Sequence, residues 1–241
     1  MQEKTRAVVL SYVKYGDNSI IATMYTEKHG RQSFLIKGVK GKKARFRLNL
    51  FQPLYLLSLD VNIKSGRALQ RIQDLKIELP FHSIPYDIVK STQAMFLAEM
   101  LGKALKEAEK NQDLFDFLYH SIAYFDALEQ GKSNFHILFL LHLTRFLGFY
   151  PNNNYQEGFR FDLSNGCFSD ELFSGNQYVL DADESKLMNK MLKLPFHELH
   201  RISLSGKQRE MILEKLILYY ALHLENVLKI RSLPILHDIF R

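Results

Sequence analysis

The chain has 241 residues, 46% of them hydrophobic and 24% charged, which is typical of a globular protein with a buried core and excludes a largely disordered chain. Its single cysteine, Cys167, excludes an internal disulfide and a cysteine-rich zinc site, and indicates a reducing compartment. Residues 1–80 carry 15 Lys and Arg against 6 Asp and Glu, a net +9, whereas residues 81–241 carry 17 against 20, a net −3; this asymmetry predicts a basic first domain that meets a polyanion.

The first 80 residues have the pattern of a small β-barrel. Five segments are rich in β-branched, aromatic and other apolar residues, and the first three are separated by the turn sequences GDN and EKHG. The expected strands span 6–15, 19–26, 31–39, 54–61 and 68–79. Five short strands without a helical period predict a barrel domain over residues 1–80.

The connection between the third and fourth strands is strongly basic. It holds six cations and no acid: Lys37, Lys40, Lys42, Lys43, Arg45 and Arg47. A flexible basic loop on a small barrel is typical of proteins that follow the backbone of single-stranded nucleic acid. The alternative is a solvated loop. Candidate stacking platforms lie nearby, although aromatic residues in barrel strands more often belong to the core: Tyr12, Tyr15, Tyr25, Phe34, Phe46, Phe51 and Tyr55.

The pattern changes to helical near Pro80 and Pro85, which predicts a second, mostly helical domain over 81–241. Helices are expected over 86–108, 113–128, 134–149 and 205–228. The third is apolar on all sides, which predicts a central core helix; with two histidines and an arginine it is too short and too polar to cross a bilayer.

A turn-rich insertion near 155–180 separates these helices, with Asn165-Gly166 as a hairpin turn. Asp181 with Glu184, and Ser205 with Gln208, have the spacing of capping boxes and mark two helix starts.

Signals for catalysis and metal binding are weak. The EQGKS sequence lacks the first glycine of a phosphate-binding loop. His197 and His200 are three residues apart, not four as in a zinc-hydrolase helix, and Cys167 has no histidine beside it in sequence. We therefore expect a protein that is not an enzyme and that has no cofactor and no metal. Two further alternatives remain: a nuclease or nucleotidyltransferase using His197, Glu198 and His200, and a scaffold whose basic loop binds an acidic protein.

An ordered set of short motifs resembles the bacterial RecO family of DNA repair proteins. The motifs are Tyr15-Gly16-Asp17, Tyr25-Thr26, His29-Gly30, Lys37-Gly38, Gln52-Pro53 and the later sequence LTRFLGFYPN. The resemblance covers nearly the whole chain in order and length. It implies an OB-fold followed by a mostly helical domain, which agrees with the pattern above.

The resemblance also implies a function. Members are recombination mediators that bind single- and double-stranded DNA, anneal complementary strands and, with RecR, help load RecA onto strands coated by single-strand binding protein. The implied DNA-binding residues are the six loop cations, with Arg31, Arg67 and Arg71 as possible neighbours. An OB-fold RNA-binding or translation-associated protein is the alternative, because nothing in the sequence distinguishes a 2′-hydroxyl.

Two further expectations follow from the resemblance. Some members hold zinc with a cysteine cluster after the LG(Y/F)xP motif, whereas here Cys167 stands alone, so we expect packing of Phe159, Phe161 and Phe168 to hold that segment. The C-terminal tail of single-strand binding protein needs an apolar pocket with a cation, for which Arg145, Phe146 and Phe149 are candidates. With no secretion signal and no membrane segment recognised, we expect a cytoplasmic, nucleoid-associated protein.

Overall fold

The computed structural model of the protein describes residues 2–39, 45–106, 109–170, 178–225, 227 and 229–240. The chain packs as two compact units, Met1–Ala127 and Leu128–Arg241. The expected boundary near residue 80 stays a prediction: strands give way to helices between Ile77 and Ile88, yet the packing divides the chain after Ala127.

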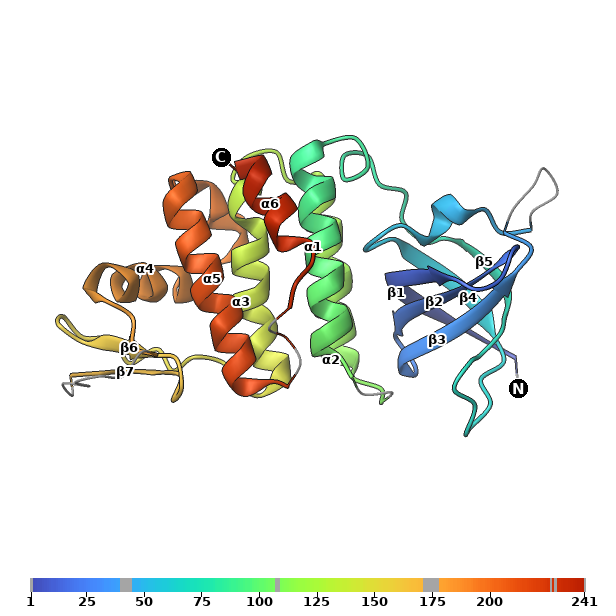
Figure 1. The fold of residues 1–241 in the computed structure, drawn as a ribbon, viewed down its shortest axis with the longest axis horizontal. Helices are drawn as coiled ribbons and strands as arrows, with labels where there is room; N and C mark the ends of the chain where they lie inside the picture. The colour runs from blue at the N-terminus through green and yellow to red at the C-terminus, as the bar shows by residue number, and fades with distance from the viewer. Residues whose placement is uncertain are drawn as a thin grey trace. The chain divides into compact units, whose positions relative to one another are not determined.

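A five-stranded antiparallel sheet begins the first unit (Figure 1). Its strands are β1 (Glu3–Lys14), β2 (Ser19–Thr26), β3 (Gly30–Lys37), β4 (Leu56–Val61) and β5 (Ile72–Ile77). The order β3-β2-β1-β4-β5 places β1 at the centre, and a register shift between Val9 and Ser11 bends that long strand where it passes from β2 to β4.

The two edge strands approach each other at one point. Gln70, just before β5, forms a parallel bridge with Phe34 of β3. The backbone N–H of Gln70 donates to the Ser33 carbonyl at 2.8 Å, and the N–H of Leu35 donates to the Gln70 carbonyl at 3.0 Å. The sheet therefore curls nearly into a barrel, and the predicted OB-like fold is confirmed.

Alternating strand residues fill the inside of this curled sheet. The core includes Val9, Ala22, Met24, Phe34 and Leu57, all at most 1% exposed. Short side chains such as Ala22 beside large ones such as Phe34 allow the faces to interdigitate. A 3-10 turn at Leu48–Phe51 adds the fully buried Phe51 to this core.

Helices α1 (Ile88–Ala104) and α2 (Gln112–Ala127) complete the first unit. Asp87 caps α1 by accepting hydrogen bonds from the N–H groups of Val89 and Lys90. At the other end of α1, Arg31 of β3 donates from Nη1 to the carbonyls of Gly102 (2.9 Å) and Leu105 (2.8 Å). A cation at a helix C-terminus is favourable, so Arg31 ties the sheet to α1.

Arg6 of β1 ties the sheet to α2. Its guanidinium makes two hydrogen bonds with Glu27, at 2.7 and 3.1 Å, and lies 3.7 Å from the Asp116 carboxylate. The same group stacks over the rings of Phe115 and Tyr119, with its carbon 5.2 and 4.8 Å from the ring centres.

Gly30 explains one of the sequence motifs. It has a φ of +56°, and a Cβ at this position would lie 2.2 Å from the carbonyl oxygen of Glu109. Glycine is therefore required where β3 begins beside the segment between α1 and α2.

The second unit is built around α3 (Phe135–Leu147) and α5 (Gly206–His223), which lie side by side (Figure 1). The other elements are the 3-10 turns η2 (Lys132–Asn134) and η3 (Phe196–Arg201), the hairpin β6 (Arg160–Asp162) and β7 (Cys167–Ser169), and helices α4 (Ala182–Leu192) and α6 (Leu233–Phe240). Within the described residues, no helix is both long and apolar enough to cross a membrane.

The prediction of α3 as a core helix is confirmed, since all residues from Phe135 to Leu141 are buried. The hydroxyl of Tyr220 on α5 donates to the Leu140 carbonyl at 2.7 Å, which satisfies a polar group inside the apolar interface. Both predicted capping boxes, at Asp181 and Ser205, are present. The N-cap of α3 is Asn134, the last residue of the 3-10 turn Lys132–Asn134.

Aromatic packing and a buried aspartate hold the turn-rich insertion. The rings of Phe161 and Phe168 lie 4.9 Å apart, and Phe161 also contacts Tyr219 of α5; Phe159 is half-buried. Asp162, 1% exposed, accepts hydrogen bonds from the backbone of Ser164 and from Asn165. This network closes the hairpin between β6 and β7.

Candidate nucleic-acid interface

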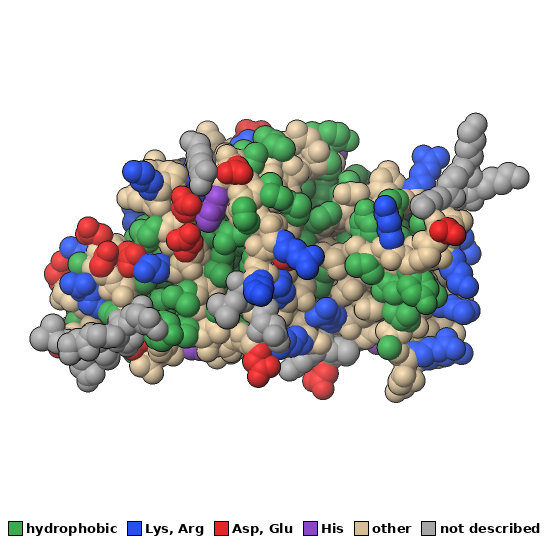
Figure 2. Space-filling model, viewed as in Figure 1, with side chains coloured by type: hydrophobic (Ala, Val, Ile, Leu, Met, Phe, Trp, Pro, Cys, Tyr) green, Lys and Arg blue, Asp and Glu red, His purple; other side chains and the backbone are tan. Residues whose placement is uncertain are grey.

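The connection between β4 and β5 forms one wall of a basic cavity on the first unit. The cavity has a volume of about 410 Å³, and it is lined by Arg45, Asn62, Lys64, Arg67, Arg71, Ile72 and Gln73. Four of these are cations, and the described lining residues include no acid. Figure 2 shows Lys and Arg side chains predominating along the edge of the surface formed by the N-terminal strands. We call this site the basic cavity.

Gln70 fixes the shape of this connection. Its side chain is buried at 3% exposure, accepts from the N–H of Lys64 at 3.0 Å, and donates to the carbonyls of Lys64 and Arg67 at 3.0 and 2.9 Å. Its backbone pairs with β3 as described above. One buried amide therefore holds the ends of the 64–67 turn, and the exposed side chains of Lys64 and Arg67 project from it.

Arg45 brings the end of the basic loop to the same cavity. Its guanidinium lies 5.2 Å from the centre of the Phe46 ring and donates to the carbonyl of Gln73 on β5. Phe46 is buried among the barrel residues, so it anchors Arg45 at the cavity wall. Folding thus brings together three residues that the sequence proposed separately, Arg45, Arg67 and Arg71, and adds Lys64.

The other proposed DNA-binding residues are placed differently. Lys37 is exposed at the end of β3, and Arg47 is exposed beside the 3-10 turn. Arg31 is the second residue of β3, about 20 Å along the strand from Lys37, and its guanidinium is engaged with α1. Lys40, Lys42 and Lys43 lie outside the described residues.

Most of the aromatic residues proposed as stacking platforms are buried in the barrel. Phe34 and Phe51 are fully buried, and Tyr25 is 3% exposed. Tyr15 is the most exposed of the seven proposed, at 55%. The chemistry that the site offers is therefore mainly attraction and hydrogen bonding to phosphates, with little surface for stacking bases.

The candidate site for the tail of single-strand binding protein lies at the end of α3. Arg145 is exposed, with its guanidinium carbon 4.2 Å from the centre of the Tyr150 ring and a hydrogen bond to the Tyr150 hydroxyl. Phe149 packs against Tyr219, Tyr220 and His223 of α5, with ring centres 5.1 to 5.6 Å apart. Phe146 and Phe149 are both half-buried. Phe149 therefore contributes to the packing of the second unit and is only partly available to a ligand.

The histidines of the enzymatic alternative do not form a compact site. His197 is 77% exposed, and the Glu198 carboxylate pairs with Arg201 at 2.7 Å. Among the described residues, the one group of three potential metal ligands is elsewhere, at Glu210, Glu214 and His237. Sequence reasoning missed that group, since His237 follows Glu214 by 23 residues.

The comparisons with known proteins agree with the motif pattern. Residues 1–81 match the family described as Recombination protein O N terminal, and residues 85–234 match Recombination protein O C terminal. The chain is 37% identical to the DNA repair protein RecO of Bacteroides fragilis, 36% identical to that of Phocaeicola vulgatus and 35% identical to that of Flavobacterium psychrophilum. Each match covers 241 residues, 100% of this chain and 100% of the relative. With both halves matched and full-length relatives above one-third identity, the chain belongs to the RecO family of DNA repair and recombination proteins.

Proposed function

We propose that this chain is a recombination and repair mediator that binds single- and double-stranded DNA and anneals complementary strands. The basic cavity carries the proposal: four cations converge on one surface of an OB-like sheet. We also propose the exposed Lys37 and Arg47, and the loop cations Lys40, Lys42 and Lys43, as DNA contacts. The guanidinium of Arg31, which the sequence proposed as a neighbour of these cations, is instead held by the carbonyls of Gly102 and Leu105. We also propose that the protein works with RecR to load RecA, and that it does so in the cytoplasm at the nucleoid.

Phosphate recognition suits this task. Contacts to phosphates carry no sequence information, so one surface serves single strands and duplexes alike. Neutralising phosphates reduces the repulsion between two complementary strands as they approach each other. The small stacking surface leaves the bases available for pairing. The burial of Phe34, Phe51 and Tyr25 therefore supports annealing over tight binding to unstacked bases.

The salt dependence of binding tests the site. Each phosphate neutralised contributes about 0.7 to the logarithmic salt slope on single strands and about 0.9 on duplex. Changing Lys64, Arg67 and Arg71 together to Gln is expected to lower the single-strand slope by about 2. Lys193→Gln, an exposed cation after α4, is the matched control. A slope that the triple variant leaves unchanged would place the DNA elsewhere.

Annealing tests the function. Two complementary oligonucleotides coated with single-strand binding protein are mixed with the wild-type chain, the triple variant, and a variant with Lys40, Lys42 and Lys43 changed to Gln. We expect acceleration that falls in both variants and weakens with salt. No acceleration at any salt would overturn the mediator proposal, and tighter binding to structured RNA than to single-stranded DNA would favour the RNA-binding alternative.

The tail of single-strand binding protein is proposed to bind at Arg145 with Phe146 and Phe149. The exposed guanidinium and the adjacent Tyr150 ring support this placement, because the tail combines acidic residues with an aromatic one. A fluorescent tail peptide titrated against the wild type and Arg145→Ala measures the contribution. Unchanged affinity in the variant would remove this site.

A further inference from the structure

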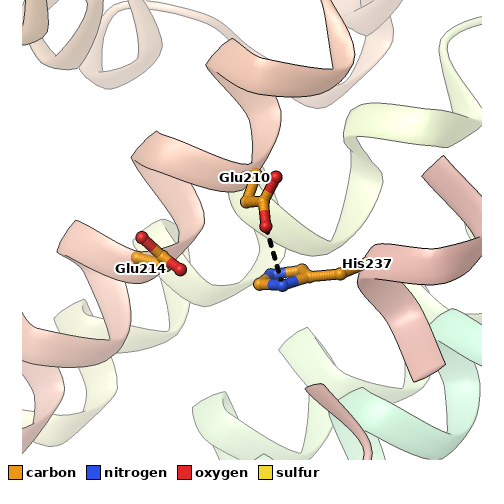
Figure 3. A group of neighbouring side chains, drawn as sticks. All are labelled: Glu210, Glu214 and His237. Atoms are coloured by element: carbon orange, nitrogen blue, oxygen red, sulfur yellow. Dashed lines mark ion pairs between the residues drawn. The ribbon is translucent and has the colours of Figure 1, made fainter. Parts of the chain in front are cut away.

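Two carboxylates and an imidazole converge where α6 packs on α5 (Figure 3). Glu210 and Glu214 lie one turn apart on α5, and His237 faces them from α6. One ligand atom from each residue lies within 4.8 Å of the others. The group joins two consecutive helices, α5 and α6.

His237 is poised to bind a further ligand. Its side chain is 14% exposed, and Nδ1 lies 3.1 Å from Oε1 of Glu210. Its Nε2 is buried and has no hydrogen-bond partner within the described residues. Nδ1 faces the carboxylates, so an ion bound among them would take the Nδ1 lone pair and leave the imidazole proton on Nε2.

The dimensions of the group suit a small transition ion. Ligand bonds of about 2.1 Å place tetrahedral donor atoms about 3.4 Å apart. Donor atoms that now lie within 4.8 Å of one another therefore need to approach by at most about 1.4 Å. Glu214 is exposed and makes no hydrogen bond or ion pair with any described residue, which leaves its carboxylate free to rotate inward. Three protein ligands with a water in the fourth position is a common zinc arrangement.

Solvent reaches the group through a cavity of about 430 Å³ whose lining includes Glu210 and His237. Two cations, Lys207 and Arg209, also line it. Arg209 is engaged elsewhere: it donates to Oδ1 of Asn134 and to the carbonyl of Leu204, and it stacks on Phe240. The pair of carboxylates therefore offers the negative charge that an ion needs at this place.

We propose that Glu210, Glu214 and His237 bind a divalent transition ion, with Zn²⁺ as the best match, and that the ion fastens α6 to α5. Imidazole with carboxylates suits Zn²⁺, whereas Mg²⁺ prefers oxygen ligands alone. The bound ion replaces the single ion pair between Glu210 and His237 with a three-point link. Its place in the second unit makes it independent of the basic cavity.

Calorimetric titration of the tag-free, chelator-treated full chain with ZnCl₂ tests the proposal. We expect one ion per chain, with affinity at least tenfold lower in Glu214→Gln and in His237→Gln. Glu214→Gln is the cleaner variant, because the exposed side chain makes no contact that the fold needs. Glu129→Gln, an exposed acid before α3, is the matched control and should bind as the wild type does.

Hydrogen exchange of α6 provides a second measurement. Zn²⁺ should slow exchange in Leu233–Phe240 severalfold in the wild type and leave Glu214→Gln unchanged. Absence of zinc binding, or binding that survives both ligand variants, would overturn the proposal. Equal affinities for Mg²⁺ and Zn²⁺, together with an affinity that His237→Gln leaves unchanged, would also overturn it, because the two glutamates alone would then bind the ion.

Discussion

The contact of Arg6 with Glu27 predicts a specific dependence of stability on pH. The hydrogen bond from Arg6 lowers the pKa of Glu27 from its ordinary value of 4.5 to about 2, against the opposing effect of burial. Because the folded-state pKa is depressed, the stabilisation is fully present above pH 4.5 and is lost as the pH falls toward 2. Glu27→Gln removes the charge and should remove this dependence.

The size of the effect follows from the same shift. A full shift of this size would correspond to about 3 kcal/mol in the free energy of unfolding. The Arg6 side chain is 31% exposed, and solvent screening reduces the expected cost of Glu27→Gln near neutral pH to about 1–2 kcal/mol. Linkage then requires most of the difference between variant and wild type to disappear between pH 6 and pH 3.

Urea unfolding of the two proteins at pH 6, 4.5 and 3 measures the difference directly. Glu78→Gln serves as the control in the same unit, since this carboxylate makes no ion pair with the described residues and should show a small difference at every pH. Equal stability of Glu27→Gln and wild type at pH 6 would refute the reasoning. A difference that stays constant down to pH 3 would also refute it, because it would not come from the ionised carboxylate.

Three other changes have definite expected outcomes. Gly30→Ala should lower the free energy of unfolding by at least about 2 kcal/mol in urea denaturation, because the new Cβ meets the Glu109 carbonyl in a left-handed conformation; an unchanged midpoint would contradict this. Gln70→Ala should weaken DNA binding severalfold in fluorescence anisotropy without altering charge, because it releases the turn that presents the cations; unchanged affinity in a folded variant would show that the turn needs no such support. Ser205→Ala should cost about 1 kcal/mol by removing the cap of α5, again measured in urea, and a stability equal to wild type would mean that the cap adds nothing.

Local patterns predicted most of the elements. The alternation in the first 80 residues gave five strands, and the caps at Asp181 and Ser205 mark helix starts that depend only on neighbours in the sequence. The end of α5 was less predictable: the apolar pattern continues to residue 228, but the helix ends at His223 and α6 follows separately. Apolar periodicity does not indicate where a helix ends and the chain turns to pack a further helix on it.

Side-chain partners that come from distant segments were not predictable. Arg31 and Arg67 look alike in the sequence, but Arg31 meets the carbonyls at the end of α1, more than 70 residues away, while Arg67 projects from a turn. Gln70 has no charge and no motif, yet it organises the basic cavity. The group of Glu210, Glu214 and His237 depends on the packing of α6, which the sequence pattern did not indicate.

The net charge of +9 over residues 1–80 therefore overstates the number of cations available to a nucleic acid. Arg6 is paired with Glu27 and Asp116, and Arg31 caps a helix, so both stabilise the first unit. Moving either toward a phosphate would leave a partly buried carboxylate or two helix carbonyls without their donor, which opposes the gain from the new contact. The cations of the basic cavity face no such competition from acids among the residues lining it. It follows that the salt slope should respond to Lys64, Arg67 and Arg71, whereas changes at Arg6 should appear first in stability.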